Sequence, residues 1–479
     1  MNTGYYINFQ RETEKGARVK YVRATMYIPN IRECCLKTSE NGEVLWQSNV
    51  DSYFGSTSQA EDLPVYYNDY LKGIREKVED RIISLGHRND SFFFFTDVHT
   101  ILDGRNNNSF NSGKIIGNLM KTTNINKAVF GGDIAPALGS RQNMIDTMSD
   151  FAEQWYRHIA PYGKLYSVKG NHDFHITDNG TRITLPQGSV RNYFMNRQNM
   201  EAGLHYDDNN QESVYFYTDN RGQKIRYIFV DTMDTVDWTF SKPQSDFCYN
   251  AIANAPSGYG IVVIGHIPAC ETNAPTIQTL ADFLGGFRNK QSVTINGTVY
   301  DFTSVESDLL FMLAGHEHRD DFVAYKNVPY FIVACDTLVN DYKVGQFGET
   351  DDFPNKVRGT IYEVTFDAVF VDIQNETVQF VRIGGGYDRI CHFNTNRVNA
   401  GSTIQLQTTV EDPEWLDCDG TGNYYGGWDP NTGMYIYENS HTKVSVNNGT
   451  VTGLATGNAL VCARNRITKV MEIFVIEVV

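Results

Sequence analysis

The middle of the chain alternates between short, continuous apolar runs and stretches with a helical repeat of apolar residues. Residues 91–96 contain four consecutive phenylalanines, which predicts a strand buried on both faces, as in a parallel or mixed central sheet. Before this run, apolar residues recur at helical spacing from Asp69 to Leu85, and Gly86 ends the repeat. This segment is therefore predicted to be an amphipathic helix that packs on the domain that follows it.

The same alternation continues through the next 240 residues or so. Further strands are expected at 127–130, 164–168, 225–230, 260–264, 309–314 and 330–334, and helices at 115–121, 142–159, 244–253 and 275–287. Residues 174–222 are polar and are expected to form an insertion. Strand and helix in alternation predict an α/β fold.

Two segments at the ends of the chain lack helical periodicity. Residues 1–60 are predicted to be a small β-rich region. Beyond residue 359 only strands are expected, first at 360–366, 369–373 and 377–383. The turn-rich segment 396–479 is predicted to be a β-sandwich, which leaves 61–395 as a central domain with a leading helix.

Polar side chains gather where the predicted strands end. The residues at these ends are Asp97, His99, Asp133, Asn171, His172, His266, His316 and His318, which include five of the eleven histidines. Open α/β sheets place their sites at the carboxyl ends of strands. In extended backbone, residues i and i+2 point to the same side, so His316 and His318 are expected to converge on one place. Neutral imidazole suits zinc, iron and similar ions.

These strand ends form the ordered series D-x-H, G-G-D, G-N-H-D, G-H and G-H-x-H. With this series, residues 89–390 resemble the calcineurin-like metallophosphoesterase family. The resemblance implies a two-sheet sandwich flanked by helices (αββα). It also implies two divalent or trivalent metal ions, which would be manganese, iron or zinc.

The resemblance assigns a role to each strand-end residue. Asp97, His99 and His318 would hold the first ion. Asn171, His266 and His316 would hold the second ion, and Asp133 would bridge the two. The ions would lower the pKa of a bridging water, so that hydroxide attacks phosphorus, and would neutralise charge on the phosphoryl oxygens.

Expectations also follow for His172 and for three residues near these motifs. His172 would be the general acid that protonates the leaving oxygen. Asp173 would lie behind the ligands or have a plain structural role. Arg141 would contact substrate phosphate, against the alternative of a solvated surface arginine. Pro136 stands where the family often has an acidic residue that orients the catalytic histidine, so the orientation of His172 is left unexplained.

The C-terminal segment carries a second resemblance. Residues 444–457, with the sequence Val444-Ser445-Val446 followed by Asn447-Asn448-Gly449, resemble the end of a bacterial Ig-like domain of group 2. Such domains imply attachment to a particle or a cell surface.

The composition of the chain bears on its substrate class and on its place in the cell. The 479 residues carry a formal net charge of −16, which disfavours nucleic acid as the main substrate. A small phosphorylated substrate is compatible with this charge, because bound cations can dominate the local field. No signal peptide or apolar run of about 20 residues is found. We therefore expect cytoplasmic synthesis and no membrane span, a pattern that also fits a phage virion protein.

Two function classes stay open. The first is a dinuclear phosphoesterase that acts on a phosphate mono- or diester. The second is a phage or surface structural or adhesive protein with a vestigial phosphoesterase domain. The complete set of predicted ligands favours the first, and a nuclease is the next candidate among enzymes.

Overall fold

The computed structural model describes residues 4–8, 23–27, 35–37, 44–47, 67–86, 89–99, 109–134, 140–173, 175–178, 181–185, 187–195, 198, 202–234, 239–270, 277–336, 360–419, 428–429, 434–435 and 441–479. In the N-terminal region it describes four strands that form two antiparallel pairs. The strands are β1 (Gly4–Asn8) with β2 (Arg23–Tyr27), and β3 (Cys35–Lys37) with β4 (Val44–Gln47).

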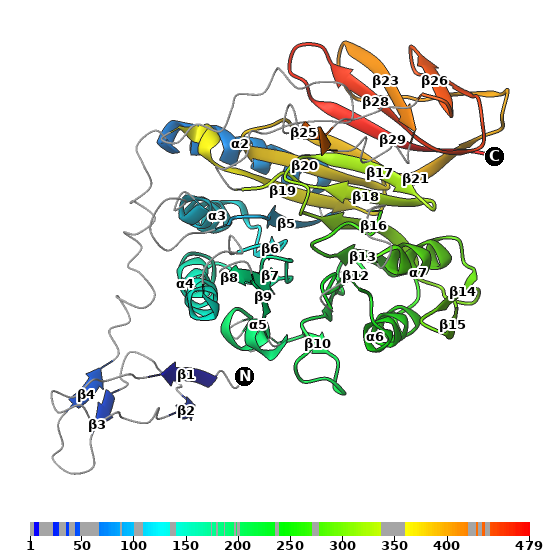
Figure 1. Cartoon of the computed structure of the whole chain (residues 1–479). Helices are drawn as coiled ribbons and strands as arrows, with labels where there is room; N and C mark the ends of the chain where they lie inside the picture. Colours follow the sequence, from blue (N-terminus) through cyan, green and yellow to red (C-terminus); the bar gives the residue numbers. More distant parts are fainter. Residues whose placement is uncertain are drawn as a thin grey trace.

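Two large β-sheets form the centre of the molecule (Figure 1). The first has nine strands in the order β23 (Pro413–Asp419), β28 (Gly457–Asn465), β29 (Met471–Val478), β21 (Arg389–Val398), β20 (Thr377–Gly384), β19 (Thr365–Asp372), β5 (Asn89–Phe95), β6 (Lys127–Phe130) and β7 (Lys164–Ser167). The second has seven strands in the order β10 (His205–Tyr206), β11 (Phe216–Asn220), β12 (Ile225–Phe229), β13 (Gly260–Ile264), β16 (Asp308–Ala314), β18 (Val328–Ile332) and β17 (Asp321–Tyr325).

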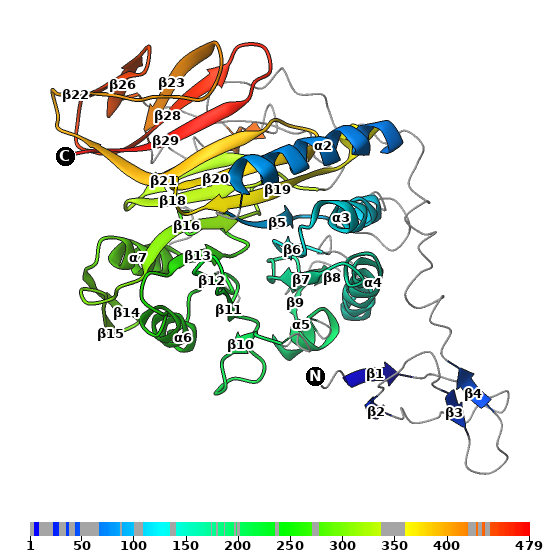
Figure 2. The ribbon, with the colours of Figure 1, turned by 180° about the vertical axis from the view of Figure 1, so that it is seen from behind.

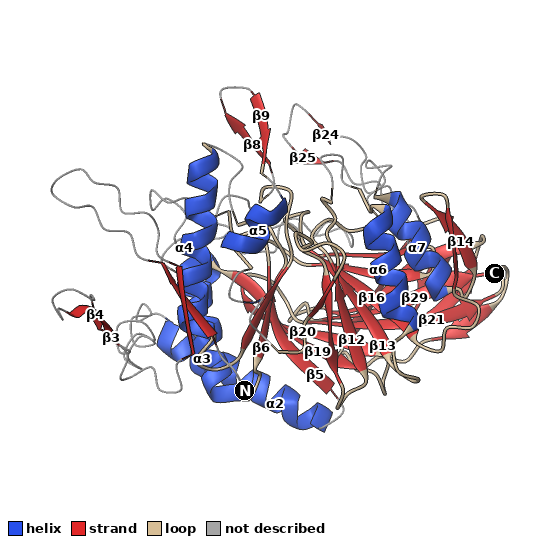
Figure 3. Ribbon diagram, turned by 90° about the horizontal axis from the view of Figure 1, so that it is seen from below, coloured by secondary structure: helices blue, strands red, loops and turns tan. Residues whose placement is uncertain are grey.

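Helices cover the outer faces of the two sheets. They are α2 (Tyr67–Leu85), α3 (Ser109–Thr123), α4 (Arg141–Ile159), α5 (Gln187–Tyr193), α6 (Lys242–Ala253) and α7 (Gln278–Arg288). Figure 3 shows α3 and α4 on one side of the strands and α6 and α7 on the other. The αββα sandwich expected from the sequence is therefore confirmed. None of the described helices has the length and hydrophobicity of a membrane-spanning helix.

The phenylalanine run on β5 explains why the sheets stack. Phe92 meets Tyr227 of the second sheet edge to face, with ring centroids 5.8 Å apart. Phe95, on the opposite face of the strand, stacks on Trp155 of α4 at 4.0 Å. Alternate side chains of a strand point to opposite faces, so a strand buried on both sides needs an apolar residue at every position. All four phenylalanines are at most 2% exposed.

The leading helix packs where the sequence predicts. α2 lies across β19 and β20 (Figure 2), and the hydroxyl of Tyr70 accepts a hydrogen bond from the backbone N–H of Gly384 at 2.6 Å. Lys77 forms an ion pair of 2.7 Å with Asp388. The helix therefore packs on the domain that follows it, and its assignment to the domain 61–395 stays a prediction.

The expectation of separate strands at 360–366 and 369–373 is wrong. Residues 361–363 form a short 3-10 helix, η5 (Ile361–Glu363), and β19 then runs without a break through Asp367. The carboxylate of Asp367 is fully buried and pairs with Arg382 at 2.9 Å and with Arg389 at 2.8 Å. Two arginines neutralise the charge, so the strand tolerates an acidic residue in its centre.

The segment beyond residue 396 forms a β-sandwich that shares a sheet with the central domain. β21 crosses residue 396 and pairs in parallel with β29, while β23 and β28 extend the same sheet. The second layer is a three-stranded sheet of β22 (Thr403–Gln405), β27 (Thr450–Gly453) and β26 (Val444–Asn447). A separate apolar cluster that includes Val451, Val461 and Phe474 fills the space between the layers. The domain boundary at 396 stays a prediction.

Small antiparallel pairs complete the fold. They are β8 (His175–Asp178) with β9 (Thr181–Thr184), β14 (Ser292–Ile295) with β15 (Thr298–Asp301), and β24 (Trp428–Asp429) with β25 (Met434–Tyr435). The first pair and α5 lie within the predicted insertion at 174–222. In Figure 3 the hairpin of β8 and β9 projects next to α5.

Candidate metal centre

The predicted ligands lie at the carboxyl ends of five strands in two sheets. Asp97 and His99 follow β5, Asp133 follows β6, and Asn171 and His172 follow β7, all in the nine-stranded sheet. His266 follows β13, and His316 and His318 follow β16, both in the seven-stranded sheet. β5, β6 and β7 are mutually parallel, as are β13 and β16, so each set of ends shares one edge. Neither sheet alone holds the whole set.

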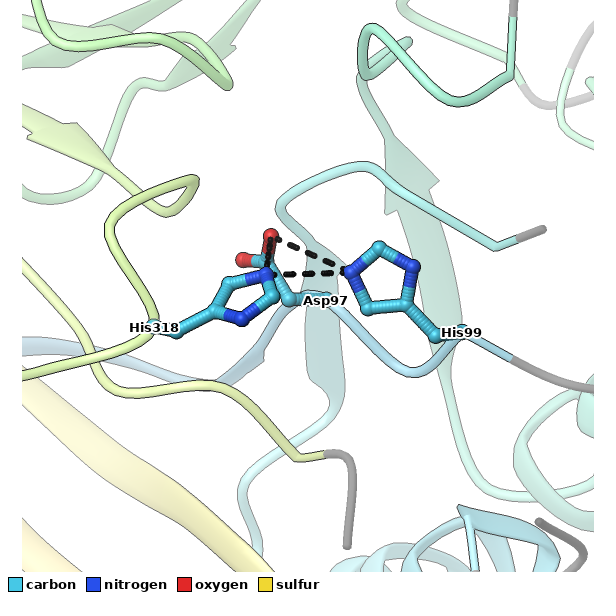
Figure 4. Close-up of side chains that lie close together, drawn as sticks. All are labelled: Asp97, His99 and His318. Atoms are coloured by element: carbon cyan, nitrogen blue, oxygen red, sulfur yellow. Dashed lines mark hydrogen bonds and ion pairs between the residues drawn. The ribbon is translucent and has the colours of Figure 1, made fainter. Parts of the chain in front are cut away.

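Asp97, His99 and His318 form the first group (Figure 4). The Nε2 atoms of His99 and His318 lie 3.0 Å apart. The Oδ1 atom of Asp97 lies 3.2 Å from Nε2 of His318 and 3.9 Å from Nε2 of His99. Three donor atoms from both sheets thus point at one spot.

Asn171, His266 and His316 form the second group together with Asp133. The Nε2 atom of His266 lies 3.0 Å from Oδ1 of Asn171 and 3.2 Å from Oδ2 of Asp133. Donor atoms of Asp133, His266 and His316 all lie within 4.8 Å of one another. The imidazole rings of His266 and His316 meet edge to face at 5.2 Å.

Asp133 lies between the two groups. Its Oδ2 atom, 3.2 Å from His266 in the second group, is also 3.9 Å from Nε2 of His99 in the first. Its Oδ1 atom accepts a hydrogen bond of 2.8 Å from the backbone N–H of His172. Asp133 is therefore close to donor atoms of both groups, and its role as the bridge stays a prediction.

The surroundings of Asp97 fit a bound cation. Its Oδ2 atom accepts hydrogen bonds from the Thr96 hydroxyl at 2.6 Å and from the backbone N–H of His316 at 3.0 Å. Its Oδ1 atom is buried and has no hydrogen-bond donor of good geometry in the part of the chain that the structure describes. A buried carboxylate oxygen without a donor is costly, and a metal ion would remove that cost.

His266 is held in the tautomer that a metal ligand needs. Its Nδ1 atom lies 2.7 Å from the carbonyl oxygen of Gly131, which can only accept. Nδ1 therefore carries a proton, which leaves Nε2, facing Asn171 and Asp133, as the ring nitrogen that a metal ion would bind.

Burial and the two carboxylates set the charges of the cluster. Burial lowers the pKa of His99 and of His316 to about 4, so both imidazoles are neutral near pH 7. Burial would raise the pKa of Asp97 and Asp133, but His266 and neighbouring histidines hold the pKa of both well below its usual range. Burial would lower the pKa of His266, but Asp133 and Asp97 raise it to about 10. The buried carboxylates thus need a positive partner, which His266 or a bound cation can supply.

Asp173 ties two of the strand-end loops together. Its carboxylate accepts hydrogen bonds from the backbone N–H groups of Asp133 at 2.9 Å, Ile134 at 2.7 Å and Gly170 at 2.9 Å. Burial and the nearby Asp133 carboxylate raise the pKa of Asp173 to about 6. Asp173 therefore lies directly behind the loops that carry the predicted ligands, and its carboxylate has a structural role there.

The backbone is strained at the cluster. Five of the seven predicted ligands have a positive φ, a region that residues other than glycine rarely adopt. The angles are 55° at Asp97, 41° at His99, 62° at Asp133, 75° at His316 and 57° at His318. Strain of this kind persists where the surrounding structure enforces it, and it gathers at functional sites.

The extended-backbone argument for His316 and His318 is wrong. Both residues are left-handed, and their side chains diverge, with His316 next to His266 and His318 next to His99 and Asp97. The turn after β16 therefore sends one imidazole to each group.

Replacing Gly315 by alanine is expected to weaken Mn²⁺ binding about 10–100-fold, as loss of ligand support typically does. A Cβ atom there would collide with the Thr96 hydroxyl and lie 2.6 Å from Oδ2 of Asp97. Titration calorimetry with Mn²⁺ measures the change. Gly73→Ala on α2, where nothing lies within 4 Å of the added Cβ, is the control and should leave binding unchanged. Wild-type affinity in Gly315→Ala would contradict the expected role of this loop.

Arg141 is not brought to the cluster by any contact of the described residues. It is exposed at the first position of α4, where its guanidinium donates a hydrogen bond of 3.2 Å to the carbonyl oxygen of Thr184 in β9. Pro136 lies outside the described residues. Sequence reasoning missed Thr96, whose hydroxyl supports Asp97, because a threonine at a strand end carries no signal of its own.

The motifs lie within a match to a known family. The model of the calcineurin-like phosphoesterase family matches residues 91–320. Among solved structures, a dimetal phosphatase from Danio rerio is 11% identical with a TM-score of 0.39 and covers 63% of this chain and 98% of its own. A phosphopantetheinyl hydrolase from Mycobacterium tuberculosis is 13% identical with a TM-score of 0.27 and covers 52% and 91%. A predicted phosphoesterase from Streptococcus pneumoniae is 10% identical with a TM-score of 0.24 and covers 62% and 90%. No match was found among curated proteins.

Proposed function

We propose that this chain, whose residues 91–320 form a calcineurin-like phosphoesterase domain, hydrolyses a phosphate mono- or diester of a small molecule with two bound metal ions. The main support is the convergence of carboxylate, imidazole and amide donors from two sheets, with Asp133 between the two groups. The buried Oδ1 atom of Asp97, for which the described residues supply no hydrogen-bond donor of good geometry, adds to that support.

The first ion would be held by Asp97, His99 and His318, the second by Asn171, His266 and His316, with Asp133 shared. Imidazole and carboxylate donors suit manganese, iron or zinc. Only two carboxylates contribute, and Asn171 binds through a neutral amide oxygen, so the loaded site would keep positive charge for a phosphate. The ions would supply an acidified water as nucleophile and neutralise charge on the phosphoryl group.

His172 would protonate the leaving oxygen. Its side chain is about one-third exposed, whereas the side chain of the ligand His266 is fully buried. Its ring meets that of His99 edge to face at 4.8 Å, and its backbone N–H is held by Asp133. These contacts support an imidazole fixed at the rim of the cluster, within reach of solvent and substrate.

The test is hydrolysis of chromogenic phosphate esters by the whole chain. After chelator treatment and reloading with Mn²⁺, we expect turnover of p-nitrophenyl phosphate or bis-p-nitrophenyl phosphate that the chelated protein lacks. The preferred ester would distinguish a monoesterase from a diesterase. No turnover of either ester in protein that has bound Mn²⁺ would contradict the proposal.

The β-sandwich at residues 396–479 would serve as an attachment module. Its support is the resemblance to bacterial Ig-like domains of group 2 and its two-layer form. The proposal includes synthesis of the protein in the cytoplasm and its attachment to a phage particle.

A further inference from the structure

A fully buried lysine precedes the Gly170-Asn171 turn. The Nζ atom of Lys169 lies 2.7 Å from Oδ2 of Asp231 and donates a hydrogen bond of 2.8 Å to the carbonyl oxygen of Met233. The side chains of Lys169 and Asp231 are 0% and 1% exposed. Lys169 follows β7 of the nine-stranded sheet and Asp231 follows β12 of the seven-stranded sheet, so this ion pair joins the two sheets.

The loop that receives Lys169 is itself fixed. Oδ1 of Asp231 accepts the N–H of Met233 at 2.9 Å. The side-chain amide of Gln244 on α6 accepts from the backbone N–H of Asp231 at 2.6 Å and donates to its carbonyl oxygen at 2.9 Å. The loop is therefore a rigid anchor.

The same loop also holds His266. The hydroxyl oxygen of Thr232 accepts the backbone N–H of Ile267 at 3.0 Å. Residues 231–233 are thus tied to Lys169, two positions before Asn171, and to Ile267, one position after His266. Asn171 and His266 belong to different sheets, and their side chains meet at 3.0 Å.

We propose that Lys169 and Asp231 are positioning residues that set the distance between Asn171 and His266, and so assemble the second metal position. This inference rests on the proposed two-metal function. The loop that carries His318 has a separate link to Asp97 of the first position, the hydrogen bond from the backbone N–H of His316. Removal of the Lys169–Asp231 pair is therefore expected to weaken binding of the second ion and to leave binding of the first ion unchanged.

Stability alone explains such a pair poorly. Taking two charges out of water costs free energy that their attraction does not always recover, and apolar replacements of whole buried pairs are often neutral or stabilising. What an ion pair adds is a fixed geometry at a fixed place, which the second metal position requires.

A matched control exists near the opposite ends of these strands. Lys127 on β6 forms an ion pair with Asp90 on β5, and Asp90 accepts a hydrogen bond of 2.7 Å from the hydroxyl of Tyr227 on β12. This mostly buried network also joins the two sheets, but it lies away from the strand ends that carry the ligands. Lys127→Met therefore tests the loss of a mostly buried ion pair, here within the nine-stranded sheet, at a place away from both metal positions.

The experiment measures Mn²⁺ bound per chain, by elemental analysis after dialysis and by titration calorimetry. The proteins are the wild type, Lys127→Met, Lys169→Met and the double variant Lys169→Met with Asp231→Asn, which leaves no unpaired buried charge. We expect two ions in the wild type and Lys127→Met. In the Lys169 variants we expect one ion to bind with wild-type affinity. The affinity for the second ion is expected to fall about 10–100-fold, as for other groups that support metal ligands.

Three other results would overturn the inference, and a fourth would contradict the proposed function. Two ions of unchanged affinity in the folded double variant would overturn the inference, as would an equal loss of both ions. Unfolding of the double variant, seen by circular dichroism, would also overturn it, because the pair would then serve the fold. A wild-type protein that binds fewer than two ions would contradict the proposed function itself, independently of Lys169.

Discussion

Asp133→Asn is expected to lower turnover about 10²–10³-fold or more and to reduce the number of metal ions retained. The carboxylate lies between the two groups of donors, 3.2 Å from His266 and 3.9 Å from His99. An amide keeps the shape but has one oxygen and no charge, so it cannot hold two cations. Kinetics with a chromogenic ester and elemental analysis of the same preparation measure both effects.

The matched control is Asp146→Asn. Asp146 is an exposed acceptor for Gln142 on α4, so its amide should leave turnover and metal content unchanged. Wild-type turnover in Asp133→Asn, with both ions retained, would mean that the shared carboxylate is misassigned.

His172→Gln is expected to lower turnover of an alkyl phosphate ester about 10²–10⁴-fold, the usual contribution of general acid catalysis, while metal content stays unchanged. Esters of p-nitrophenol should lose much less, because p-nitrophenolate leaves without needing a proton. The ratio of the two losses therefore reports proton donation and not a general loss of structure. His205→Gln, at an exposed ring that stacks on Tyr217, is the control.

A loss of metal in His172→Gln would contradict this role. His99, Asp133 and His172 also bring donor atoms within 4.8 Å of one another, and Nε2 of His172 lies 3.9 Å from Oδ2 of Asp133. A third way to hold an ion is therefore available in the geometry, and metal content distinguishes a ligand from a proton donor.

The sequence predicts most of the sandwich because local patterns control its strands. The phenylalanine run of β5 needs apolar surroundings on both faces, and any sheet that buries it must be covered by helices and a second sheet. The sequence also predicts that the ligands lie close together, since the carboxyl ends of neighbouring parallel strands share an edge.

What sequence reasoning could not supply are pairings between distant polar residues. Asp367 interrupts an apolar run, and only the arginines brought by β20 and β21 make it compatible with the centre of a strand. Lys169 and Asp231 are 62 positions apart and no periodicity connects them. The family resemblance assigns His316 and His318 to different ions, but the left-handed backbone that separates their side chains is not revealed by the side-chain pattern.

The proposed function requires that these strand ends hold two metal ions side by side. Anomalous diffraction from crystals grown with Mn²⁺ tests it most directly. We expect two peaks about 3.5–4 Å apart, one next to Asp97, His99 and His318 and the other next to Asn171, His266 and His316, with Asp133 touching both. A single peak, or no peak in crystals grown at a saturating concentration of Mn²⁺, would contradict the two-metal account.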